Sequence, residues 1–63
     1  MKKFEYLTVP VIPRVFASNE KYVEQLSMEL NAHGAEGWEL VVINGSLSVE
    51  GYVILVFKQE LVA

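Results

Sequence analysis

The strongest constraint on this chain is the run Val53-Ile54-Leu55-Val56-Phe57, which is apolar throughout and shows no alternation with polar residues. Successive side chains of a strand point to opposite faces of its sheet, so a strand with this pattern must be covered on both faces. The rest of the chain contains one convincing helix, which can cover one face. The sequence therefore predicts more apolar sheet than the chain can cover alone.

The helix is expected from about residue 19 to residue 33. Ser18 or Asn19 can cap its first turn, and Glu20 suits the positive end of the helix dipole. On a wheel of 100° per residue, one stripe contains Val23, Leu26, Ser27 and Leu30, with Tyr22 and His33 at its borders and Met28 turned outward. We expect this stripe to pack on the sheet.

The segment Gly34-Ala35-Glu36-Gly37-Trp38-Glu39-Leu40 joins the helix to the next strand. We expect Gly34 to end the helix in a left-handed conformation and Gly37 to allow a second bend. Trp38 lies where helix meets sheet. Its expected role is to fill that corner, and the alternative is a stacking platform for a ligand.

Strands are expected at residues 3–9, 38–43 and 52–59. Pro10 cannot donate to a ladder, so the first strand either ends there or lies on an edge. The third strand is the most apolar and should be central, which gives the order 1-3-2. The prediction is a single α+β domain over residues 1–63 with β-α-β-β order. Its three-stranded mixed sheet would have two outer strands parallel to each other and antiparallel to the centre, and one helix on one face.

Two hairpins can join the last two strands. One uses Asn44-Gly45 as a tight turn, and the other, which we favour, places Ile43 opposite Tyr52 across a longer loop. The favoured register puts Trp38, Leu40, Val42, Val53, Leu55 and Phe57 on the helix side. It leaves about 400 Å² of contiguous apolar surface on the other side, a large patch for a monomer. This predicted oligomer interface consists of Val41, Ile43, Tyr52, Ile54 and Val56.

Composition supports self-association. A chain of 63 residues buries only about 60% of its unfolded surface and is marginally stable, and it has no cysteine for a disulfide or a cysteine metal site. Hydrophobic residues nevertheless make up 52% of it. The net charge of −3 argues against binding to nucleic acid or anionic membranes. The apolar run from Tyr52 to Phe57 is too short to span a bilayer, so we expect a cytoplasmic protein.

Few residues suggest chemistry. His33 and Glu29 can share a helix face, but two ligands are too few for a metal unless symmetry supplies more, and no cofactor or metal is expected. Glu36 and Glu39 flank the tryptophan, and we expect Glu39 to pair with Lys58 across the strands. The connection over residues 10–18 is apolar for a loop. It either covers one end of the core or reaches a neighbouring subunit or pocket, and Arg14 is its only charge.

The heptapeptide from Gly34 to Leu40, followed by Val41-Val42 and by Gly51-Tyr52-Val53-Ile54-Leu55-Val56-Phe57-Lys58, resembles the small bacterial and phage proteins grouped as domain of unknown function 4177. The resemblance implies a β-α-β-β fold with Gly34, Gly37 and Trp38 as shared structural positions. It implies no activity.

Three functions are compatible with these patterns. The first is a non-enzymatic, homo-oligomeric binding module whose small-molecule or protein partner lies in grooves between subunits. The second is a phage-type protein that sequesters a small anionic, nucleotide-like signal, with Arg14 and Lys21 on phosphate and Tyr22 or Tyr52 stacked on the base. The third is a small enzyme that uses His33 with Glu29 or Glu36.

Overall fold

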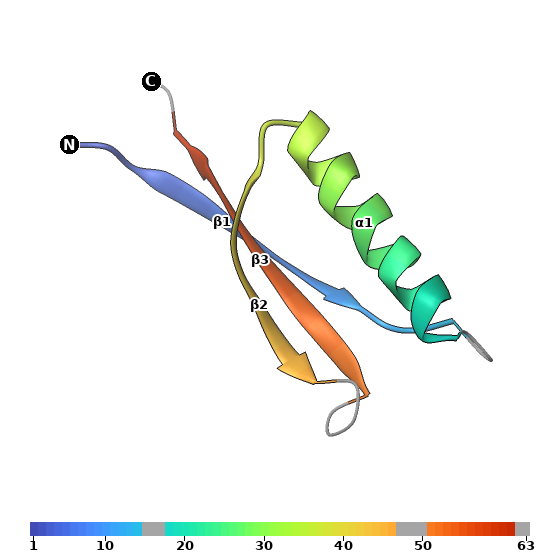
Figure 1. The fold of residues 1–63 in the computed structure, drawn as a ribbon. Coiled ribbons are helices and arrows are strands. Elements are labelled where there is room, and N and C mark those ends of the chain that lie inside the picture. The colour runs from blue at the N-terminus through green and yellow to red at the C-terminus, as the bar shows by residue number, and fades with distance from the viewer. Residues whose placement is uncertain (15–17, 47–50, 62–63) are drawn as a thin grey trace.

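The computed structural model describes residues 1–14, 18–46 and 51–61. Its elements are β1 (Phe4–Val11), α1 (Asn19–Ala35), β2 (Glu39–Ser46) and β3 (Tyr52–Glu60). The strands form one sheet in the order β1-β3-β2, and β3 is antiparallel to both of its neighbours. The helix α1 lies along one face of this sheet (Figure 1). The predicted β-α-β-β order, strand order and α+β class are confirmed.

Strand β1 continues through Pro10, which lies opposite Ile54, and it ends at Val11 rather than at Val9. Because β1 is an outer strand, the missing amide of Pro10 can face away from the sheet without breaking the ladder. Of the two alternatives that the sequence left for Pro10, the edge position is the one observed.

Both predicted hairpin registers are wrong. Strand β2 does not turn at Asn44-Gly45 but continues to Ser46, which pairs with Tyr52, and Ile43 lies opposite Leu55. Gly45 has φ 102°, and a Cβ there would approach the Tyr52 carbonyl oxygen to 2.9 Å. The glycine therefore allows close approach of two strands rather than a reversal of the chain.

An irregularity between Leu40 and Val42 shifts the β2 register. Residues directly opposite each other in an antiparallel pair share a face. Ile43 therefore lies on the side of Leu55 and α1, whereas Val42 lies on the other side with Val56. The predicted face assignment of this strand is reversed beyond the bulge, because one extra residue inverts the alternation.

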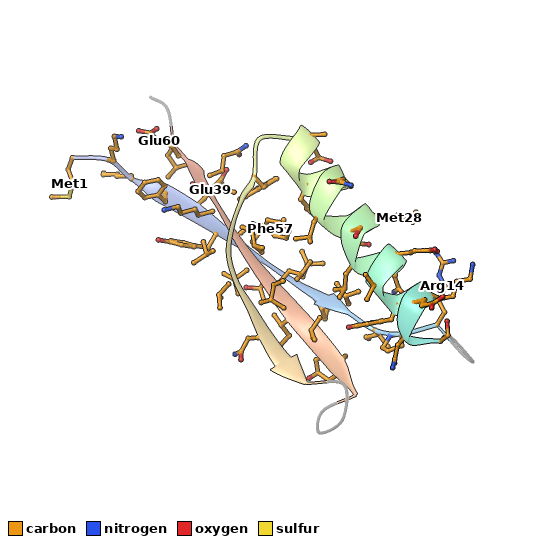
Figure 2. The ribbon with its side chains drawn as sticks, in the orientation of Figure 1. Met1, Arg14, Met28, Glu39, Phe57 and Glu60 are labelled. Atoms are coloured by element: carbon orange, nitrogen blue, oxygen red, sulfur yellow. The ribbon has the colours of Figure 1, made fainter. Side chains whose placement is uncertain are left out.

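The core lies between α1 and the inner face of β1 and β3 (Figure 2). Its buried residues are Val11, Tyr22, Val53, Leu55 and Phe57, and its partly buried neighbours are Leu7, Val9, Leu26, Leu30 and Trp38. Trp38 thus packs against the core, as predicted.

The helix is rotated relative to the predicted stripe. Tyr22 is 3% exposed, whereas Val23 is 59% exposed. The Tyr22 hydroxyl donates to the Val11 carbonyl at 2.6 Å, and the Gln25 amide donates to the Ile12 carbonyl at 2.8 Å. These bonds hold one flank of α1 against the end of β1, so the flank that carries Val23 is turned away from the core.

The predicted role of Gly34 is wrong, because Gly34 lies inside α1 and the left-handed residue is Gly37, with φ 91°. The Gly37 amide donates to the Gly34 carbonyl and the Trp38 amide to the His33 carbonyl, both at 3.0 Å. This pattern is the Schellman motif, in which a left-handed residue satisfies the last free carbonyls of a helix. Gly37 therefore performs the role expected of Gly34.

Substitution by alanine is predicted to change the free energy of unfolding in opposite directions at Gly37 and Gly34. Gly37→Ala forces a left-handed alanine, at a cost of ~1–2 kcal/mol, and its Cβ would lie 2.9 Å from Gln59 Nε2. Gly34→Ala places a methyl group where nothing lies within 4 Å, and it should stabilise the helix by up to ~1 kcal/mol. Urea unfolding at one protein concentration measures both changes, and equal losses for the two variants would contradict the assignment.

Candidate interaction surface

One face of the sheet carries no helix in the part of the chain that the structure describes. We call it the open face. It consists of Phe4, Tyr6, Thr8, Pro10, Val42, Tyr52, Ile54 and Val56, which alternate with the buried residues along their strands. Most of these side chains are apolar or aromatic. The open face is thus the candidate site for binding another molecule.

Exposure differs across the open face. Tyr6 on β1 is 63% exposed, and Val42 on β2 is 46% exposed. Ile54 and Val56 on β3 are only half-buried, although no layer covers them, because the two neighbouring strands shield the central one. The least exposed apolar side chains therefore form the middle of the face, and more exposed ones surround them.

Charged groups collect at one end of this face. Lys58 Nζ lies 4.0 Å from Glu39 Oε2 on β2 and 4.8 Å from the centre of the Phe4 ring on β1. Figure 2 labels Glu39 and Glu60 at this same end of the sheet. The predicted pair between Glu39 and Lys58 is confirmed. Glu39 is largely exposed and Lys58 is partly buried, so the pair adds little stability and instead marks a polar border.

The molecule is thin and extended. Its Cα atoms span 45 × 23 × 13 Å with a radius of gyration of 13.3 Å, against about 10.6 Å for a compact domain of this length. Its accessible surface is 4912 Å², about 800 Å² more than a compact protein of this mass exposes. A sheet with only one covered face accounts for both differences.

Three residues of the predicted interface, Tyr52, Ile54 and Val56, lie on the open face. Ile43 lies on the helix side of β2, and Val41 lies at the bulge. The sequence analysis missed Val42 and the contribution of β1. The alternation of Phe4, Tyr6 and Thr8 was readable, but nothing in it indicated which side would face α1.

The residues suggested for an anionic ligand do not form one cluster. Arg14 and Lys21 are exposed near the start of α1, and Lys21 Nζ lies 3.8 Å from Glu24 Oε2. Tyr22 is buried in the core, and a ring there has no free face for a base. Tyr52 lies at the end of the sheet nearest the start of α1, where Arg14 and Lys21 are, but it belongs to the open face.

His33 is held structurally. Its Nδ1 lies 2.8 Å from the Glu29 carbonyl oxygen, and its ring stacks on Phe57 with centroids 4.8 Å apart. The Glu36 carbonyl accepts a bond from Gln59 at 2.9 Å. Among the described residues, no three histidine, cysteine or acidic side chains gather as a metal ligand set. No described helix has the length and apolar character needed to cross a membrane.

These features define a small α+β domain with one helix-covered sheet face and one open face. The family model described as domain of unknown function (DUF4177) matches residues 4–60, and the chain belongs to this family. No curated protein and no solved structure gives a significant match.

The Tyr22 hydroxyl joins two paired strand ends, since it donates to the Val11 carbonyl and accepts from the Val53 amide at 3.2 Å. Tyr22→Phe leaves these buried backbone groups without the hydroxyl, which should lower the free energy of unfolding by about 1–3 kcal/mol. Tyr6→Phe is the matched control on the exposed face and should change little. Urea denaturation measures both variants, and equal stability would show that the bridge contributes nothing.

Proposed function

We propose that this protein is a non-enzymatic, homo-oligomeric binding module in which the open faces of two copies pack together. A ligand or protein partner then binds in the grooves where the subunits meet. The observation that carries the proposal is the position of the apolar face opposite α1, the one helix among the described residues. No described element of the same chain covers that face, and a second copy presents an identical surface to it.

The areas support a second copy as the occupant. A standard interface buries about 800 Å² on each partner. The accessible surface of 4912 Å² exceeds that of a compact chain of this mass by about the same amount. Packing of two open faces would therefore bring each chain close to the exposure of an ordinary folded protein.

The distribution of side chains also suits a two-sheet contact. Ile54 and Val56 occupy the centre of the face, and Lys58 and Glu39 lie at one end. An apolar centre with charged groups at the border is the usual arrangement of a protein interface. Two sheets packed in this way lie about 10 Å apart with interdigitated side chains, so the border pairs can remain in water.

The proposed grooves lie at the end of the sheet where β1 leaves for α1. Tyr52 borders the open face at this end, and Ile12 is exposed just after β1. When two faces pack, these side chains lie at the margin of the contact and remain accessible. An apolar or aromatic group on a partner is the chemistry that this margin favours.

The test is the mass of the assembly. Ile54→Lys and Thr8→Lys each place an unpaired charge in the middle of the open face. Both should raise the dissociation constant more than tenfold, which is at least about 1.4 kcal/mol. Met28→Lys, on the outer surface of α1, is the control and should leave the assembly intact.

Sedimentation velocity and native mass spectrometry measure the assembly, and circular dichroism confirms that each variant folds. Native mass spectra of the unmodified protein also reveal any small molecule that co-purifies. A folded wild-type monomer at micromolar concentration would overturn the proposal, and so would an assembly that both lysine variants leave unchanged.

A further inference from the structure

The outer edge of β2 is the second surface that the described residues leave without a partner. Leu40, Val41, Val42 and Ile43 follow one another along it, each between 39% and 49% exposed. Glu39 is the only charged residue of the strand, and the strand contains no proline or lysine. Outer strands of monomeric proteins normally carry proline or charged residues, which prevent pairing with another chain.

The opposite edge of the sheet, formed by β1, has features that hinder pairing with another chain. Strand β1 contains Pro10, which removes one donor, and Glu5, which adds a charge. Just after its end, the Ile12 carbonyl accepts a bond from the side-chain amide of Gln25 on α1. A β2 strand from another copy is therefore poorly accommodated at β1. This difference favours pairing of β2 with β2, which closes as a dimer rather than growing as a filament.

The backbone of β2 indicates how such a pair would align. The Val53 amide of β3 donates to the Tyr22 hydroxyl on the β1 side, so the groups of Gly45, which lies opposite Val53 on β2, face the outer edge, where the Gly45 amide is bonded to Asn44 Oδ1 at 2.9 Å. Every second residue of an antiparallel strand directs its N–H and C=O to the same side. Ile43, two residues earlier, therefore presents both groups outward at the centre of the strand.

We infer that β2 pairs antiparallel with β2 of a second copy, centred on Ile43, and joins the two sheets into one of six strands. Each Ile43 amide then donates to the Ile43 carbonyl of the other copy. Antiparallel alignment sends the two Glu39 carboxylates to opposite ends of the pair, whereas parallel alignment would place these like charges side by side.

The symmetry has a structural consequence. An antiparallel pair of strands is related by a two-fold axis perpendicular to the sheet, so both α1 helices lie on the same side. The sheet surface between the two helices carries the exposed Leu40 and Ile43 of each copy. The other side joins two open faces into one continuous surface. This inference uses a different surface from the proposed function and does not depend on it, and the two contacts together give an assembly of four copies.

The experiment separates the two contacts by mass. Ile43→Lys places a charge on the edge, and Val23→Lys, at another exposed apolar site on α1, is its matched control. We expect Ile43→Lys to halve the mass of the wild-type assembly in sedimentation velocity, Val23→Lys to leave it unchanged, and Ile43→Lys with Thr8→Lys to give a monomer.

An assembly mass that is the same for Ile43→Lys and wild type overturns the edge pairing and leaves the face contact standing. The same conclusion follows if Thr8→Lys lowers the assembly mass and Ile43→Lys does not. If Thr8→Lys has no effect and Ile43→Lys produces monomers, the proposed function fails and the edge pairing holds. A wild-type monomer, including one whose edge binds an extended peptide from another protein, overturns the inference.

Cross-linking provides a readout that does not depend on the tolerance of the fold for lysine. The chain has no cysteine, so Ile43→Cys introduces a single thiol, which the proposed register places opposite its own copy. The Cα separation of about 5.5 Å in such a pair lies within the range of a disulfide. Mild oxidation should give a covalent dimer on a non-reducing gel for Ile43→Cys and not for Met28→Cys, and equal yields would contradict the register.

Discussion

Two-sided apolar character in the central strand is the constraint on which this structure depends. Strand β3 alternates Val53, Leu55 and Phe57 toward α1 with Ile54 and Val56 toward the other side. One helix can cover one side, and α1 does so over β1 and β3. Burial of apolar area is the main favourable term in folding, and the apolar side chains of the second side remain available for further burial.

The position of α1 decides which further surfaces remain open. The Tyr22 hydroxyl and the Gln25 amide bind backbone carbonyls at the end of β1, and the Schellman turn at Gly37 fixes the other end of the helix. Both helix ends are therefore tied to the sheet. In this position Val23 remains exposed, and the sheet face opposite α1 remains open, whereas the free edge of β2 follows from the strand order β1-β3-β2.

Much of the fold was predictable, because it rests on signals local in sequence. The capped helix, the apolar central strand and the position of Trp38 against the core were all identified from neighbouring residues. Pro10 was correctly restricted to an end or an edge. Three of the eight residues of the open face were also predictable, since Tyr52, Ile54 and Val56 point away from the Leu55 side on any regular strand.

Other features required contacts between residues distant in the sequence. The bulge at Leu40 and Val42 reverses the side on which Ile43 lies, and a single sequence shows no sign of an added residue in a ladder. Asn44-Gly45 was considered as one of two possible turns, because Asn-Gly commonly forms a turn, whereas here Gly45 allows β2 to approach Tyr52 closely. Register, unlike alternation, depends on which strand is adjacent.

By itself, the sequence determined the one helix and three strands of the described residues, and it showed more apolar sheet than that helix can cover. Periodicity and end signals are properties of adjacent residues, so they can be read without a structure. Only the tertiary structure decided which side chains form the open face, which glycine ends the helix and which edge is unprotected. Those outcomes depend on the hydroxyl of Tyr22 meeting Val11 and on the pairing of β2 with β3, which bring together residues far apart in the chain.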